Sequence, residues 1–152
     1  MNVLFVCNGN ICRSPIAEAM LKKKYAVNNI EAVVASAGFE SFNINEPPDS
    51  RAQELAKKNN LTLDSRSRLF LKSDFDTFHK IYVMDTRNYR DVMDLARNDQ
   101  DRAKVDYLLN VLEPGKNKVI PDPFMRGERD LETVYTLIDR ATDEIVILAK
   151  SN

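Results

Sequence analysis

Both cysteines of the chain lie in one short stretch, FVCNGNICRSP, which spans residues 5–15. Cys7 and Arg13 enclose five residues, and a helix is predicted to begin directly after them. A turn between a strand and a helix points several backbone N–H groups into one concavity, and the helix N-terminus behind them favours an anion. Arg13 adds a planar, bidentate grip on a phosphate-like oxyanion. The stretch therefore predicts a phosphate cradle.

The same cradle alters the chemistry of the first thiol. Cationic neighbours and a helix N-terminus favour the thiolate form of a cysteine, so we expect Cys7 to be ionised at neutral pH. A thiolate that faces a bound phosphate is a nucleophile placed for in-line attack. Ser14 can donate a hydrogen bond to the departing sulfur and make it a better leaving group. Gly9 gives the loop backbone conformations that are closed to most other residues.

Other cysteine chemistries fit this sequence less well. A Cys–His hydrolase needs an imidazole, and the single histidine, His79, stands just before a predicted strand. A metal site needs more ligands than Cys7 and Cys12 supply. The stretch is not a Walker loop either, because no Gly-Lys-Ser/Thr sequence ends it.

The bulk properties describe an ordinary globular chain. Its 152 residues predict a single domain over 1–152. Basic and acidic residues are intermixed with a net charge of −1, which disfavours a nucleic-acid partner. No apolar stretch approaches the ~18 residues that cross a membrane. The start of the sequence does not read as a signal peptide, and two cysteines do not make a disulfide scaffold. We therefore expect a cytoplasmic protein.

Strands and helices are predicted to alternate along the chain. Apolar, β-rich runs predict strands at 2–7, 31–38, 80–85 and 105–112. Helical spacing predicts helices from Ser14, over 49–60, over 86–98 and over 131–148, with a long loop at 113–130. Ser14 is the expected N-cap of the first helix, with Pro15 at its first position, and Asp49 or Ser50 is the expected cap of the second.

This alternation indicates an α/β fold of three layers, with helices on both faces of a doubly wound, four-stranded parallel sheet. We expect the flavodoxin-like strand order 2-1-3-4. Ligands of such sheets bind beyond the carboxyl ends of the strands. The cysteine stretch follows the first strand, so it stands where a functional site is expected.

The segment VLFVCNGNICRSPIAEA closely resembles the signature of the low-molecular-weight protein tyrosine phosphatases. The resemblance continues in the family's order over essentially the whole chain. It runs through SAG at 36–38, PDSRA at 48–52, VMD at 83–85, PDPF at 121–124 and the helix that begins LETVY.

The resemblance implies a role for each matching residue. Cys7 would be the nucleophile that forms a phosphocysteine, and Arg13 would bind phosphate and stabilise the transition state. Asn10 would hold the loop through side-chain hydrogen bonds, and Ser14 would assist the thiolate. Asp122 would be the general acid and later the base. Family members need no metal or organic cofactor.

An acid also makes chemical sense, because tyrosine leaves with a pKa near 10 and needs a proton at neutral pH. Pro121 and Pro123 flank Asp122 and stiffen its loop. Phe42 and Phe124 are expected at the pocket mouth, where both can stack on a phosphotyrosyl ring. Such a deep slot would admit phosphotyrosine and exclude the shorter phosphoserine. The rest of the phosphate-binding loop is assigned to Asn8, Gly9, Asn10, Ile11 and Cys12.

The family pattern also gives Cys12 a role, and two of the departures from it concern the phosphate-binding loop. The second cysteine of the family can form a reversible disulfide with the nucleophile, here Cys7, and protect it from irreversible oxidation. Asn8 stands where relatives frequently have leucine, threonine or valine. Ser65 aligns with a histidine that supports the loop asparagine in many relatives.

Three alternatives are open beside the tyrosine phosphatase. Thiol-dependent arsenate reductases share the scaffold but need further cysteines, and none follows Cys12. Arginine phosphatases resemble this chain but carry threonine at the position of Ile11, and isoleucine favours phosphotyrosine. A non-catalytic phosphotyrosine- or anion-binding module is disfavoured because the nucleophile, arginine, serine and aspartate occur together.

The expected partners follow from the same resemblance. The substrate would be a tyrosine-phosphorylated protein. By analogy with the family, a bacterial tyrosine kinase of polysaccharide synthesis is one such partner. Inorganic phosphate and related oxyanions would bind as product or inhibitors.

Overall fold

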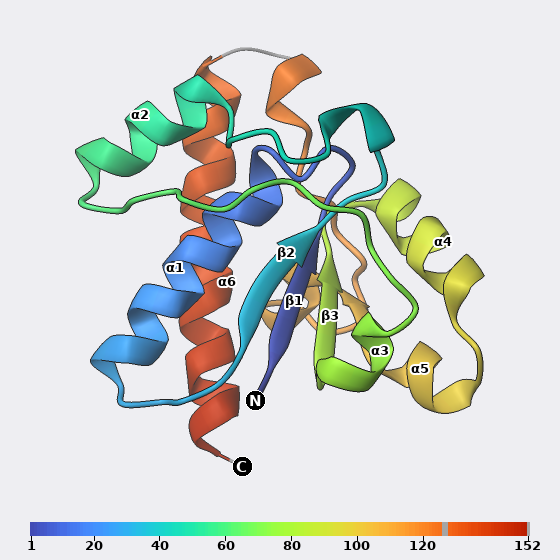
Figure 1. Ribbon diagram of the computed structural model, residues 1–152. Coiled ribbons are helices and arrows are strands. Elements are labelled where there is room, and N and C mark those ends of the chain that lie inside the picture. Colours follow the sequence, from blue (N-terminus) through green and yellow to red (C-terminus); the bar gives the residue numbers. More distant parts are fainter. Residues whose placement is uncertain (126–127, 152) are drawn as a thin grey trace.

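The computed structural model describes residues 1–125 and 128–151 and shows a three-layer α/β arrangement (Figure 1). The four-stranded parallel sheet has the order β2-β1-β3-β4, which confirms the predicted fold class and strand order. Its strands are β1 (Val3–Val6), β2 (Val34–Ala37), β3 (Lys80–Val83) and β4 (Val105–Tyr107).

Helices cover both faces of this sheet, as predicted (Figure 1). One face carries α1 (Arg13–Val27), α2 (Ser50–Lys58) and α6 (Glu128–Lys150), and the other carries α3 (Asp74–Thr77), α4 (Thr86–Leu95) and α5 (Asp99–Ala103). Short 3-10 turns occur at Ser41–Asn43, Leu108–Val111 and Pro123–Met125. No helix in 1–125 or 128–151 combines the length and apolar character needed to cross a membrane.

The central strand β1 explains where the site lies. All four of its residues are fully buried, since they pack against helices on both faces of the sheet. Side chains alternate along a strand, so Val3 and Phe5 join the core under α1 and α6, while Leu4 and Val6 join the opposite core. The residue after Val6 therefore emerges at the middle of the sheet's carboxyl edge.

The start of α1 differs from the prediction. The helix begins at Arg13 after Cys12, so Ser14 is not its N-cap but lies within the first turn. The Ser14 hydroxyl is fully buried and contacts Cys7 and Asn10 instead of free backbone N–H groups. Its functional contacts thus override its capping propensity. The second predicted cap is resolved in favour of Asp49, whose carboxylate accepts from the Ala52 N–H.

The C-terminal half shows two further boundary differences. The predicted strand 105–112 ends at Tyr107 and continues as a 3-10 turn whose Leu108 and Leu109 pack into the core beside α6. Helix α6 begins at Glu128, earlier than predicted. Residues 126 and 127 of the predicted loop lie outside the described residues.

Helix α6 should contribute strongly to stability through its buried face. Ile138 is fully buried in the core, so Ile138→Ala is expected to lower the free energy of unfolding by about 2–5 kcal/mol. Ile147 on the same helix is 57% exposed, so Ile147→Ala is expected to cost no more than about 0.5 kcal/mol. Urea denaturation of both variants measures the difference. Equal losses would contradict the packing described here.

Candidate active site

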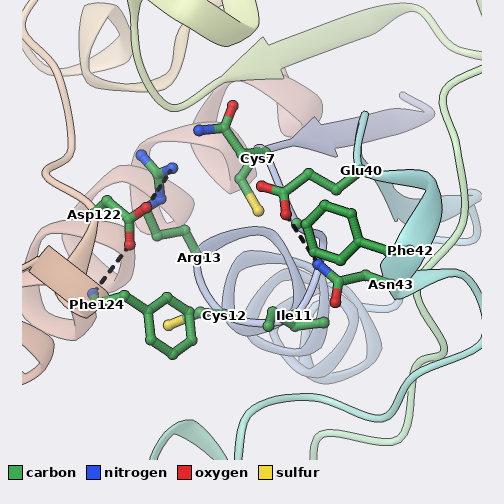
Figure 2. A pocket seen from close by; sticks show the side chains of 11 residues that line it. Cys7, Ile11, Cys12, Arg13, Glu40, Phe42, Asn43, Asp122 and Phe124 are labelled. Atoms are coloured by element: carbon green, nitrogen blue, oxygen red, sulfur yellow. Dashed lines mark hydrogen bonds and ion pairs between the residues drawn. The ribbon is translucent and has the colours of Figure 1, made fainter.

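A pocket of about 230 Å³ opens at the carboxyl edge of the sheet (Figure 2). It is lined by Cys7, Asn8, Gly9, Ile11, Cys12, Arg13, Glu40, Phe42, Asn43, Asp122 and Phe124. All but Glu40 and Asn43 are among the residues predicted from the sequence. The other two predicted residues, Asn10 and Ser14, are buried and do not line the pocket.

The loop from Asn8 to the first turn of α1 has the character of an anion site. None of the backbone N–H groups of residues 8–14 donates a hydrogen bond to an atom of the described residues. Buried backbone N–H groups are nearly always paired in folded proteins, so such a cluster of unpaired donors is unusual. With the N-terminus of α1 behind it, the loop can hold an oxyanion.

Asn10 fixes the conformation of this loop. Its backbone adopts the left-handed region with φ of 54°, which asparagine tolerates better than most residues. Its Oδ1 accepts from the Arg68 backbone N–H at 3.0 Å, while its Nδ2 donates to Ser14 Oγ and Ser36 Oγ, each at 2.8 Å. Ser65 is not among these partners.

The hydrogen bonds of Asn10 have a definite direction. Because Asn10 Nδ2 donates to the Ser14 oxygen, the Ser14 hydroxyl hydrogen is available for Cys7 Sγ, 3.0 Å away. On the other branch, Ser36 donates its own hydrogen to the buried carboxylate of Glu18 at 2.5 Å. The network thus directs one O–H group toward the sulfur.

The loop also needs a glycine beside it. Gly38 follows β2, and a Cβ added there would lie 2.7 Å from the Asn8 carbonyl oxygen and 3.0 Å from the Asn10 nitrogen. The first distance is shorter than real Cβ contacts, and the second is tight, so a side chain here would displace the loop backbone. Gly38 therefore lets the end of β2 approach the loop closely.

Arg13 is 2% exposed and is held by two acceptors. Its Nη1 donates to Asp85 Oδ2 and to the Ile120 carbonyl oxygen, each at 2.8 Å. Burial disfavours the charge, but the negative charge of Cys7 and then the hydrogen bond and charge of Asp85 outweigh it and raise the pKa of Arg13. Its Nε and Nη2 donate no hydrogen bond to a described residue, so this edge is available for a ligand.

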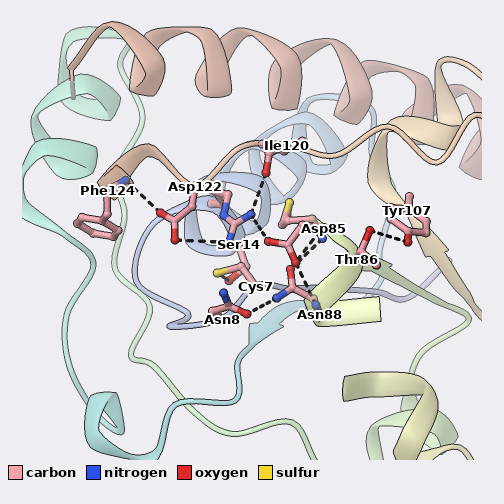
Figure 3. A network of polar contacts seen from close by, with 12 residues as sticks. Cys7, Asn8, Ser14, Asp85, Thr86, Asn88, Tyr107, Ile120, Asp122 and Phe124 are labelled. Carbon is pink, nitrogen blue, oxygen red and sulfur yellow. Dashed lines mark hydrogen bonds and ion pairs between the residues drawn. The ribbon is translucent and has the colours of Figure 1, made fainter. Parts of the chain in front are cut away.

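A polar chain links this arginine to the loop from the other side (Figure 3). Asp85 follows β3 and caps α4, where its Oδ1 accepts from the Asn88 N–H at 3.0 Å. Asn88 Nδ2 in turn donates to Asn8 Oδ1 at 2.6 Å. Asn8 is thus connected, through Asn88, to Asp85, the capping residue that also accepts from Arg13.

Asp122 lies opposite, on the loop before Pro123–Met125. Its Oδ1 accepts from the Phe124 N–H at 3.0 Å, and its Oδ2 lies 4.0 Å from Arg13 Nη2 (Figures 2 and 3). The side chain remains 34% exposed, so solvent reaches its carboxyl group. The Phe124 ring packs under the guanidinium of Arg51, which lies 5.2 Å from the ring centroid.

The two cysteines are in different environments, and both are free thiols. Burial, followed by the negative charges of Cys7 and Asp49, raises the pKa of Cys12, so this thiol stays protonated at neutral pH. Cys7 instead contacts the Ser14 hydroxyl. The same loop therefore holds a protonated thiol at Cys12 and, at Cys7, a sulfur beside a hydroxyl group.

Sequence reasoning missed four side chains of this site. Asp85 ends the VMD segment at the carboxyl edge of β3, a position that could have identified it. Asn88 offered only a capping-box signal, three residues after Asp85. Glu40 and Asn43 lie at the two ends of the 3-10 turn after β2, and nothing in the sequence distinguishes them from ordinary solvent-facing residues.

Comparisons with known proteins agree with this geometry. A family model described as low molecular weight phosphotyrosine protein phosphatase matches residues 2–151. The low molecular weight phosphotyrosine protein phosphatase of Gallus gallus is 42% identical over 137 residues, which cover 88% of this chain and 86% of that protein.

Solved structures give the same result. A protein tyrosine phosphatase from Entamoeba histolytica superposes with a TM-score of 0.91 at 33% identity, covering 99% of this chain and 97% of that one. A Drosophila arginine phosphatase superposes with a TM-score of 0.91 at 31% identity, covering 100% and 99%. Because the family model spans nearly the whole sequence, the chain belongs to the low molecular weight phosphotyrosine protein phosphatases, a family of hydrolases.

Proposed function

We propose that this protein hydrolyses phosphotyrosine in proteins through a phosphocysteine intermediate. One observation carries the proposal: Cys7, a loop of unpaired N–H groups, Arg13 and Asp122 surround a single pocket. The pocket mouth is formed by Phe42 and Phe124, which are 78% and 46% exposed and can stack on a tyrosyl ring.

In the first step, the Cys7 thiolate attacks phosphorus while the bond to the tyrosyl oxygen breaks. The loop N–H groups and the free Nε–Nη2 edge of Arg13 stabilise the charge on the equatorial oxygens. Asp122 protonates the departing phenolate. The products of this step are tyrosine and a phosphorylated Cys7, and Asp122 is left as a carboxylate.

In the second step, Asp122 takes a proton from a water molecule that attacks phosphorus. The bond from phosphorus to Cys7 Sγ breaks, which releases inorganic phosphate and restores the thiolate. The hydroxyl of Ser14, oriented by Asn10, stabilises the sulfur as its charge returns. Over both steps, phosphotyrosine and one water molecule are converted into tyrosine and inorganic phosphate.

Cys12 is proposed as a redox guard for Cys7. A disulfide between them would form when an oxidant such as hydrogen peroxide removes two electrons, and a cellular thiol would reverse it. Because Cys12 is neutral and buried, its own reactivity is low until Cys7 is oxidised.

A second candidate activity is the hydrolysis of phosphoarginine. It is supported by the likeness to the Drosophila arginine phosphatase. Ile11 favours phosphotyrosine, because this branched, apolar side chain lines the pocket wall. A bacterial tyrosine kinase is the partner that family analogy suggests, although the pocket itself indicates only a phosphorylated protein.

The experiment that tests this function compares three peptides of one sequence that carry phosphotyrosine, phosphoserine or phosphoarginine. We expect the phosphotyrosine peptide to give the highest kcat/KM, because its ring can stack between Phe42 and Phe124, whereas phosphoserine is too short to reach the loop from the mouth. Release of inorganic phosphate measures all three rates. A preference for phosphoarginine would overturn the assignment in favour of the second candidate.

A further inference from the structure

Glu40 places a carboxylate inside the pocket that the proposed mechanism does not use. It lies on the loop after β2, and its side chain faces the pocket from the side opposite to Asp122 (Figure 2). Its Oε2 accepts a hydrogen bond from Asn43 Nδ2 at 3.1 Å. A Cβ added to Gly9 would lie 3.8 Å from the same oxygen, so the carboxylate stands directly beside the anion loop.

This carboxylate has no cationic partner among the described residues. No lysine or arginine of 1–125 or 128–151 forms an ion pair with Glu40. The nearest cation of the pocket, Arg13, is already paired with Asp85. A half-buried negative charge beside a phosphate site opposes the binding of phosphate, because like charges repel most strongly where water is partly excluded.

We propose that Glu40 is a specificity-determining residue that pairs with a lysine or arginine adjacent to the phosphotyrosine of the substrate. The inference rests on the proposed function and deepens it. The phosphotyrosyl ring occupies the space between Phe42 and Phe124, and the neighbouring residue of the substrate extends over the rim. A cation there neutralises Glu40, so the repulsion on the phosphate disappears only for a basic substrate.

The same charge acts against two competitors. Free inorganic phosphate and acidic phosphopeptides bring no cation, so they meet the repulsion of Glu40 without compensation. Specificity of this kind arises as much from penalising the wrong ligand as from binding the right one. The protein therefore discriminates between basic and acidic sequences around phosphotyrosine and limits inhibition by its own product.

The test measures kcat/KM for phosphotyrosine peptides that differ only in the two flanking residues, which are lysine, glutamine or glutamate. For the wild type we expect the lysine peptide to exceed the glutamine peptide by about fivefold, the upper range for a partly exposed ion pair. The glutamate peptide should be the poorest. High salt should reduce the differences, because it screens exposed charges.

Glu40→Gln keeps the hydrogen-bond acceptor for Asn43 but removes the charge. It is expected to bring the three peptides within about twofold of one another and to tighten competitive inhibition by inorganic phosphate several-fold. The matched control is Glu31→Gln, which removes the same charge. Glu31 is exposed and precedes β2, at the end of the sheet opposite to the pocket. It should leave both the peptide ranking and phosphate inhibition unchanged.

The outcomes separate this inference from the proposed function. Equal kcat/KM for the three phosphotyrosine peptides in the wild type would overturn the role of Glu40 and leave the tyrosine phosphatase intact. A preference for lysine that survives in Glu40→Gln would also overturn it. Hydrolysis of a phosphoarginine peptide with no hydrolysis of any phosphotyrosine peptide would instead reject the proposed function.

Discussion

Replacing Cys7 with serine is expected to lower kcat for a phosphotyrosine peptide by about 10,000-fold or more, because a serine hydroxyl is un-ionised at neutral pH. Phosphate should still bind, since the loop N–H groups and Arg13 remain in place. Phosphate release measures the loss of turnover, and isothermal titration with inorganic phosphate measures the retained binding.

The control for this change is Cys12→Ser, which exchanges the same atom on the same loop. Cys12 forms no hydrogen bond with Ser14 and carries a protonated thiol, so this variant should keep measurable turnover. Wild-type kcat in Cys7→Ser would reject the phosphocysteine mechanism. Loss of phosphate binding in Cys7→Ser would show instead that the sulfur is needed to keep the loop in shape.

The second large effect is expected at Asp122. Asp122→Asn retains the side-chain oxygen that accepts from the Phe124 N–H but cannot transfer a proton. General acid–base catalysis contributes about 100- to 10,000-fold, so kcat for phosphotyrosine should fall within that range. An aryl phosphate with a more acidic phenol should lose much less, because its leaving group needs no proton.

Asp64→Asn is the matched control, since Asp64 is exposed and lies outside the pocket. Its kcat is expected to equal that of the wild type for both esters. The decisive measurement is the ratio of the two kcat values in Asp122→Asn. A uniform loss for both leaving groups would contradict a role as general acid.

The sheet could be predicted because its central strand β1 has a clear sequence pattern. Val3 to Val6 are four consecutive apolar residues, whose side chains alternate between the two faces of the sheet. They are all buried only if both faces are covered, which implies helices on both sides of the sheet. The end of β4 could not be predicted, because Leu108 and Leu109 are buried equally well by a strand or by a 3-10 turn. Helix α3 has only four residues, too few for a periodic pattern.

Residue types and spacing alone could predict only the part of the site whose residues are neighbours in sequence, whereas Phe42, Asp122 and Phe124 were predicted from the family resemblance. The loop that contains Cys7 and Arg13 is continuous, so its chemistry can be read from residue types and spacing. Asp85 stands 72 residues from Arg13, and Asn88 stands 80 residues from Asn8. Such pairs depend on how strand ends meet in space. The charge of Glu40 can affect ligand binding only because the folded chain places it beside the anion loop.

The dependence of Arg13 on distant acceptors has a consequence for biosynthesis. The Ile120 carbonyl that holds Arg13 lies 107 residues further along the chain. At about 5–20 residues per second, translation needs about 5–20 seconds to cover this interval. During that time the growing polypeptide carries Arg13 without one of its two acceptors. Under the proposed function, ribosome-bound chains that stop before Ile120 also lack Asp122, so they should show little hydrolysis of phosphotyrosine.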